Sequence, residues 1–154
     1  WAHILSNMVF LAVFGDNVEA TLGKLGYLAF YLAGGIVASV AHLLINPAST
    51  VPSLGASGAL AAILGAYIVM FPRSRVRVLV FFGFTAFFTR VTAILFLGIW
   101  FISQLFSGVA SLGVETAQTA GVAYWAHIGG FVLGLLIGFL ARGQAPDLVR
   151  RRRS

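Results

Sequence analysis

The sequence predicts an all-α polytopic membrane protein, and three observations lead to this fold class. The first is composition: of 154 residues, 60% are hydrophobic and 9% are charged, whereas soluble domains carry roughly 25% charged residues. The second is spacing, because the charged residues gather in short clusters. The apolar stretches between them are long enough for helices to cross roughly 30 Å of hydrocarbon. The third is the one-sided distribution of Lys and Arg described below.

Turn-forming residues divide the chain into five expected membrane spans. The first ends at Gly15-Asp16-Asn17, the second at Asn46-Pro47 and the third at Pro72. The approximate bounds of the five are 1–15, 25–45, 54–71, 91–107 and 123–141. Residues 1–142 are expected to form one transmembrane domain, followed by a basic cytoplasmic tail at 143–154.

The stretch from Val76 to Phe88 does not fit this scheme clearly. It is apolar but short and follows a cluster of arginines. We expect it to be either a segment at the membrane interface or an early start of the fourth span.

Basic residues set the expected orientation. With five spans, all ten Lys and Arg residues fall on one side of the membrane and none on the other. The positive-inside rule then places the C-terminus in the cytoplasm. We expect an integral protein of a bacterial plasma membrane. Because the basic residues flank apolar spans and do not line a polar face, a nucleic-acid partner is not expected.

Ser57 is the candidate nucleophile. It lies in Gly55-Ala56-Ser57-Gly58-Ala59 at the expected start of the third span, where free backbone N–H groups and the helix dipole favour negative charge. Gly55 and Gly58 are supporting glycines that allow substrate and neighbouring backbone to approach closely. Alone the pattern is weak, since a serine among small residues usually packs helices together.

His127 is the candidate base. Beside it, small residues recur every four positions at Ala126, Gly130, Gly134 and Gly138, and the third span carries its own stripe at Ser57, Ala61 and Gly65. Such stripes let helix backbones pack closely in membranes, and if these two meet, Ser57 and His127 come within hydrogen-bonding reach. The alternative is that the glycines only pack the helices and His127 is an incidental polar residue. An ionisable residue inside a span is, however, a site candidate by default.

His3 and Asn7 are candidate oxyanion donors. They are four residues apart and therefore share one face of the first helix. The first, third and last spans all run inward, which places these two residues, Ser57 and His127 in one layer near the outer face. His42, in the second span, has no accompanying pattern and is interpreted as structural.

Absent motifs narrow the chemistry. The chain has no cysteine and no His-Glu-x-x-His pattern, so thiolate metal sites and that class of zinc protease are disfavoured. Asp16 and Asp147 both lie at the expected cytoplasmic boundary, which disfavours an aspartyl protease. No carboxylate lies in the outer layer of the spans, so a Ser-His dyad is expected and not a Ser-His-Asp triad.

The motifs taken together resemble the rhomboid family of intramembrane serine proteases. The matching segments are Trp1 to Met8, Phe14-Gly15 with Glu19, Gly55 to Ala59, and Ala126 to Gly130. The resemblance implies a six-helix core, with these five spans similar to helices two to six. It also implies a fragment lacking the first transmembrane helix and the loop after it.

The resemblance further implies roles for the residues. Ser57 resembles the nucleophile and His127 the general base, while Asn7 and His3 look like side-chain oxyanion donors. Family enzymes cleave transmembrane segments of other membrane proteins near the outer face and use no metal or cofactor. Many members carry an aromatic residue where this chain has Ala61. Two alternatives follow: Trp125 or Tyr124 holds the histidine ring instead, or the ring is held less firmly.

Two other functions remain open from the sequence. A catalytically silent rhomboid-like protein would bind and escort transmembrane helices without cleaving them. A channel or transporter would show paired half-helix interruptions or a charged path, and neither is visible. The fourth span, with Trp100, Phe101 and Phe106, is a hypothetical gate for substrate entry.

Overall fold

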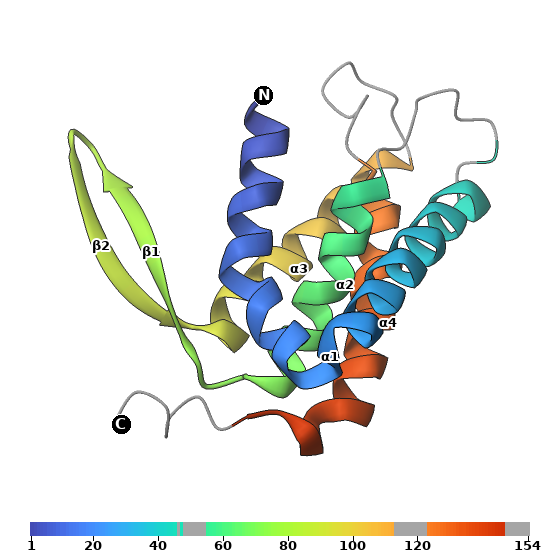
Figure 1. The fold of residues 1–154 in the computed structure, drawn as a ribbon. Coiled ribbons are helices and arrows are strands. Elements are labelled where there is room, and N and C mark those ends of the chain that lie inside the picture. The colour runs from blue at the N-terminus through green and yellow to red at the C-terminus, as the bar shows by residue number, and fades with distance from the viewer. Residues whose placement is uncertain (46, 48–54, 113–122, 147–154) are drawn as a thin grey trace.

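The computed structural model describes residues 1–45, 47, 55–112 and 123–146. Its elements are four helices and one hairpin (Figure 1): α1 (Ala2–Ile45), α2 (Gly55–Met70), β1 (Arg75–Phe82), β2 (Thr85–Thr92), α3 (Ala93–Ser111) and α4 (Tyr124–Ala141). A 3₁₀ turn, Arg142–Gln144, follows α4. Within the described residues, three helices are long and apolar enough to cross a membrane, as the predicted fold class requires.

Helix α1 consists of two limbs that meet at Gly23. The backbone there has φ 72° and ψ 162°, a left-handed conformation that glycine adopts without a steric penalty. Figure 1 shows the first limb (2–22) descending from the N-terminus and the second limb (24–45) rising away from it. The sequence predicts an end of the first span at Gly15, but the helix continues past this residue to Gly23. Gly15 is buried and packs against Tyr27.

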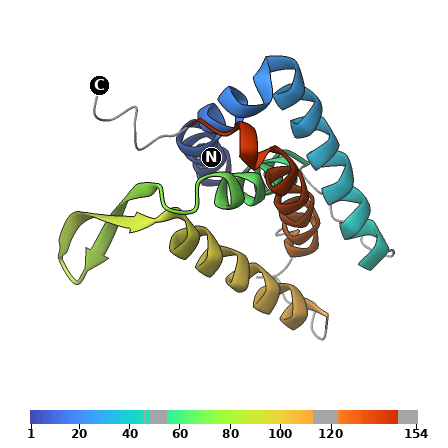
Figure 2. The same cartoon turned by 90° about the horizontal axis from the view of Figure 1, so that it is seen from below.

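Helix α2 occupies the centre of the bundle. Its residues from Ala59 to Tyr67 are buried, and it packs against α1 and α4 more than against any other element. Figure 2 shows it surrounded by α1, α3 and α4. At 16 residues the helix is about 24 Å long. Because neighbouring helices shield it from lipid, it does not need to match the thickness of the bilayer.

The contact between α2 and α4 is a backbone-to-backbone contact made by glycines. A Cβ added at Gly130 or Gly134 would overlap the carbonyl oxygen of Gly58 or Ala62, and one at Gly138 would lie 2.8 Å from that of Ala66. The expected small-residue contact between α2 and α4 therefore forms, but the α2 residues that face the α4 glycines are Gly58, Ala62 and Ala66, each one position after the expected Ser57, Ala61 and Gly65. This contact fixes the height of the first turn of α4 relative to the first turn of α2.

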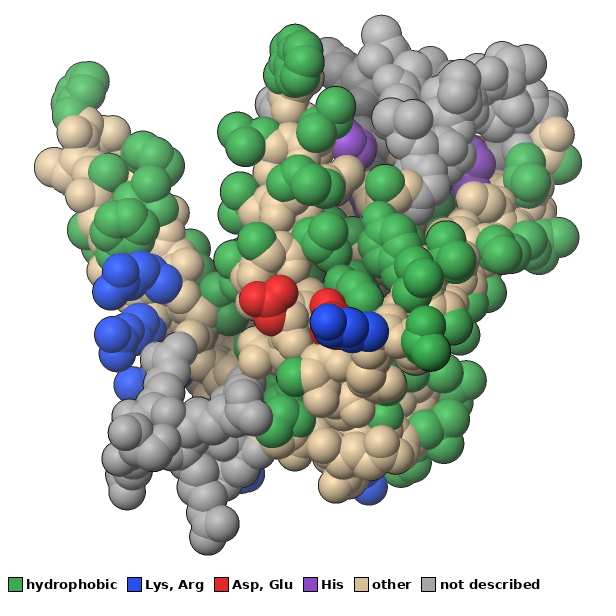
Figure 3. Space-filling view, in the orientation of Figure 1, with side chains coloured by type: hydrophobic (Ala, Val, Ile, Leu, Met, Phe, Trp, Pro, Cys, Tyr) green, Lys and Arg blue, Asp and Glu red, His purple; other side chains and the backbone are tan. Residues whose placement is uncertain are grey.

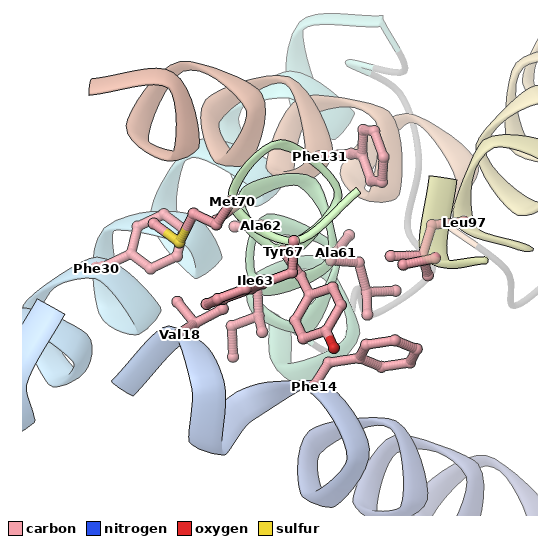
Figure 4. Packing of buried hydrophobic residues seen from close by; sticks show 14 of the residues in the cluster. Phe14, Val18, Phe30, Ala61, Ala62, Ile63, Tyr67, Met70, Leu97 and Phe131 are labelled. Atoms are coloured by element: carbon pink, nitrogen blue, oxygen red, sulfur yellow. The ribbon is translucent and has the colours of Figure 1, made fainter. Parts of the chain in front are cut away.

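Aromatic side chains fill the space on the other side of α2 (Figure 4). Phe14 packs edge-on against Tyr67, with ring centroids 4.9 Å apart. Phe96 of α3 stacks on both Phe10 and Phe14 of the first limb. Phe101 of α3 stacks on Phe131 of α4 at 4.2 Å. These contacts tie α3 to the rest of the bundle.

Residues Arg75 to Thr92 form an antiparallel β-hairpin that projects away from the helices (Figures 1 and 2). Gly83 has φ 58° and occupies the first position of the two-residue turn, where a type II′ turn needs glycine. An early start of the fourth span was therefore the wrong expectation, because α3 begins at Ala93. Runs of Val and Phe favour paired strands as well as apolar helices.

Several expected features lie wholly or partly outside the described residues. They are the joint at 46–53, most of the joint at 108–122, and the tail from residue 147 onward.

Candidate active site

Ser57 and His127 come together at one end of the bundle. Ser57 lies in the first turn of α2 and His127 in the first turn of α4. The Ser57 Oγ atom is 3.0 Å from Nε2 of His127, which is hydrogen-bonding distance. Both residues are half-buried. The two side chains are as close as expected if α2 and α4 meet along their small residues.

Gln104 of α3 contacts the other nitrogen of the same ring. Its Oε1 atom is 2.9 Å from Nδ1 of His127. The Gln104 Nε2 group donates to the hydroxyl of Ser103 at 3.2 Å, which leaves the amide oxygen directed at the imidazole. An amide oxygen only accepts, so this contact is a hydrogen bond when Nδ1 carries the ring proton. In that tautomer Nε2 can accept the hydroxyl proton of Ser57.

Gln104 is not among the residues expected from the sequence. One signal was present: a glutamine within a largely apolar span, four residues after Trp100 and hence on the same helix face. A polar residue in a span does not reveal which neighbouring helix it faces, so its partner could not be predicted.

Trp100 provides the aromatic contact to the histidine. Its ring centroid is 5.9 Å from that of His127, with the planes tilted by 39°. From the sequence, Trp125 or Tyr124 is the expected aromatic partner of this ring. Among the described residues, the ring contact is made by Trp100 instead. Ala61, where many rhomboids carry an aromatic, is buried and lines the adjoining cavity. The aromatic support therefore comes from α3 and not from α2.

A cavity of about 260 Å³ opens beside Ser57. His3, Ser6, Asn7 and Phe10 line it from α1, Ser57, Leu60, Ala61 and Leu64 from α2, Trp100 from α3, and His127 from α4. All four residues predicted to share one layer thus face one space. Polar side chains from three helices therefore face an apolar wall across this cavity.

Comparison with known proteins identifies the family. The family model described as "Rhomboid domain" matches residues 1–144 of this chain. The chain belongs to the rhomboid family. Family membership agrees with the long apolar helices of an integral membrane protein. The rhomboid motifs described from the sequence all lie within the matched range.

Individual rhomboids are similar along most of the chain. Rhomboid protein 1, mitochondrial, of Saccharomyces cerevisiae is 31% identical, with 98% of this chain and 41% of that protein covered. Rhomboid protease GlpG of Haemophilus influenzae is 33% identical, covering 90% of this chain and 62% of that protein. Rhomboid protease GluP of Bacillus subtilis is 29% identical, covering 92% and 29%. The chain spans less than two thirds of each of these relatives, and no solved structure was found to match it.

Of the other residues singled out from the sequence, Gly58 and His42 lie outside the cavity lining. Gly58 lies between α1 and α4, because a Cβ there would overlap Ala38 and come within 4 Å of Ala126. Gly55 is the first residue of α2. The Nδ1 atom of His42 is buried and has no hydrogen-bond partner among the described residues.

Proposed function

We propose that this chain is the catalytic part of an intramembrane serine endopeptidase that cleaves transmembrane segments of other membrane proteins. The observation that carries the proposal is the 3.0 Å contact between Ser57 Oγ and His127 Nε2 beside a cavity lined by Asn7 and His3. Two of the similar rhomboids are named proteases. No metal or cofactor is required for this chemistry.

In the proposed reaction, Ser57 Oγ attacks the carbonyl carbon of the scissile bond while His127 Nε2 takes the hydroxyl proton. The proton then passes to the leaving amine as the carbon–nitrogen bond breaks. A water molecule, activated by the same nitrogen, hydrolyses the acyl-enzyme. No carboxylate takes part, so the pair acts as a dyad.

The developing oxyanion is stabilised by Asn7, His3 and the backbone N–H of Ser57. Both side chains line the cavity from the first limb of α1. Preorganised donors aimed at a developing charge beside an apolar wall contribute about 3 kcal/mol each to transition-state stabilisation. His3 is exposed and Asn7 is half-buried, so Asn7 is the better shielded of the two.

Cleavage is proposed to take place near the outer face of a bacterial plasma membrane. In Figure 3 the visible histidines lie in the upper half of the molecule, and the Lys and Arg side chains lie at mid-height or below. The positive-inside rule places the basic end in the cytoplasm. The cavity then faces the outside, where water can reach Ser57.

The proposal is tested by labelling the protein in proteoliposomes with a fluorophosphonate and by measuring cleavage of a transmembrane substrate. Wild-type protein should label and cleave, and Ser57→Ala and His127→Ala should do neither. Ser39→Ala is the matched control, because that hydroxyl bonds to Gly35 within α1 and lies outside the cavity. Labelling that survives Ser57→Ala would exclude this nucleophile. A folded wild-type protein that neither labels nor cleaves would favour the silent, helix-binding alternative.

A further inference from the structure

Gln104 is the polar side chain of α3 that reaches the catalytic histidine. We propose that Gln104 is a positioning residue, which holds His127 in the tautomer and orientation needed to accept the proton of Ser57. This inference rests on the proposed protease function. It adds a third member, carried by a different helix, to the Ser57–His127 pair.

The first step of the argument is the use of both ring nitrogens. Nε2 faces Ser57 Oγ at 3.0 Å, and Nδ1 faces Gln104 Oε1 at 2.9 Å. A neutral imidazole carries one proton, and which nitrogen holds it depends on the partner of the other. With the proton on Nε2, the ring would donate to the serine oxygen and have no lone pair for the hydroxyl proton. The amide oxygen of Gln104 favours the productive tautomer.

The second step is that Gln104 is itself held in place. Its amide nitrogen donates to Ser103 Oγ at 3.2 Å, and Ser103 donates to the carbonyl of Trp100 at 2.6 Å. Gln104 is half-buried, so water competes less for its oxygen. A fixed acceptor keeps the ring oriented throughout the reaction, which lowers the entropy lost on reaching the transition state.

The third step is the shared origin of Gln104 and Trp100. They lie one turn apart on α3, and Trp100 packs against the same imidazole. A single face of α3 therefore supplies both the hydrogen-bond acceptor and the aromatic wall. Ala61 of α2 has no aromatic ring to pack on the imidazole. The position of α3 therefore determines whether His127 is oriented to accept the proton of Ser57.

Gln104→Met tests the proposal, since methionine keeps the length and unbranched shape but removes the acceptor. We expect kcat for a transmembrane substrate to fall roughly ten- to hundred-fold, with KM little changed, because a mispositioned base loses part of the roughly 10²- to 10⁴-fold that acid–base catalysis contributes. Gln144→Met is the matched control: the same replacement at an exposed residue outside the cavity. Unchanged kcat in Gln104→Met would overturn the proposal.

Gln104→Glu separates positioning from packing. A carboxylate also accepts from Nδ1, so kcat should recover toward the wild-type value. It also stabilises the imidazolium, so the acidic limb of the kcat/KM profile should move to higher pH. His3 is the other histidine that lines the cavity. The same kcat/KM profile measured for His3→Ala shows whether the acidic limb belongs to His3 or to His127. A Glu variant as impaired as Gln104→Met, with no movement of the limb, would show that Gln104 only packs.

A spectroscopic readout distinguishes failure of this proposal from failure of the proposed function. In protein with ¹⁵N-labelled histidine, the ring nitrogen shifts report the tautomer, and His127→Ala assigns the signals among the three histidines. Wild-type His127 should carry its proton on Nδ1, and Gln104→Met should move the population toward Nε2. A wild-type ring protonated on Nε2 would overturn the positioning role even in an active enzyme. The expected tautomer in an inactive protein would leave the role intact while the protease assignment fails.

Discussion

Asn7 and Ser6 are neighbours in the same turn of α1, and both line the cavity, yet only one is equipped to stabilise an oxyanion. Ser6 donates its hydroxyl proton to the carbonyl of His3 at 2.9 Å, within its own helix. The Asn7 amide belongs to a half-buried side chain and offers two N–H donors. Their adjacency provides a matched pair for testing the oxyanion site.

We predict that Asn7→Ala lowers kcat by roughly a hundred-fold or more, because removal of one oxyanion donor from a preorganised site has an effect of that order. KM should change little, since the interaction forms mainly in the transition state. Ser6→Ala should retain most of the wild-type kcat. Steady-state cleavage of a transmembrane substrate measures both, and equal effects of the two substitutions would contradict the assignment.

At this scale, the sequence identified the residues that lie within local motifs and missed those that depend on packing between helices. Ser57 and His127 each occupy a recognisable run of small residues. The spacing of four indicated a close α2–α4 contact, although the α2 residues in that contact are Gly58, Ala62 and Ala66 and not the expected Ser57, Ala61 and Gly65. Gln104 and Trp100 have no such pattern. Their role depends on the rotation of α3 about its axis, which stacking of Phe101 on Phe131 and of Phe96 on Phe10 helps to set.

Among the elements, the α2–α4 pair determines the geometry of the site. Gly130 and Gly134 place the backbone of α4 directly against that of α2, so the separation of the two first turns depends on the absence of side chains there. Gly98 of α3 provides the contrast, because nothing lies within 4 Å of where its Cβ would be. A substitution by alanine is therefore expected to lower stability at Gly130 or Gly134 but not at Gly98.

We predict that Gly134→Ala destabilises the protein by about 1–3 kcal/mol, the usual range for overpacking a close contact, and that it also lowers activity by separating His127 from Ser57. Gly98→Ala should be neutral or stabilise by about 0.5–1 kcal/mol, since alanine is the better helix former. Thermal unfolding in detergent, followed by circular dichroism, compares the two. A Gly134→Ala protein as stable as Gly98→Ala would show that the close contact does not hold the helices.

The break in α1 leads to a second prediction at the scale of elements. Gly23 has φ 72° but no atom within 4 Å of a potential Cβ, so Gly23→Ala tests backbone strain without a clash. We expect a loss of about 1–2 kcal/mol, the penalty for an L-residue in the left-handed region. Gly26→Ala, three residues later, meets only an ordinary contact with Leu22 at 3.5 Å and should not destabilise. Equal melting temperatures for both variants would argue against a fixed break.

Element boundaries were the part of the fold that the sequence predicted least well. Gly15-Asp16-Asn17 has the composition of a turn, but Gly15 is buried against Tyr27 and the helix continues to Gly23. The hairpin was missed because runs of Val and Phe fit both an apolar helix and paired strands. Only the positive φ at Gly83 and the pairing of Val80 with Phe87 separate these possibilities, and neither is visible in composition.

For the whole molecule, the main question is which end faces the cytoplasm. The cavity adjoins the first turns of α1, α2 and α4, whereas Arg142 follows the last turn of α4 at the opposite end of the bundle (Figure 1). The chain has no cysteine, so each introduced cysteine reports on a single position. Leu112, at the C-terminal end of α3, is 57% exposed, and Gly143 has no atom within 4 Å of a potential Cβ.

We predict that Leu112→Cys reacts with a membrane-impermeant maleimide in intact cells, because the end of α3 lies on the same side as the cavity. Gly143→Cys should react only after the membrane is permeabilised, since the adjoining arginine-rich end stays in the cytoplasm. The cysteine-free wild-type protein gives the background, and retained cleavage by both variants shows that each is folded. Labelling of Gly143→Cys but not Leu112→Cys in intact cells would reverse the orientation. Ser57 would then face the cytoplasm, and substrates would be cleaved near the inner face.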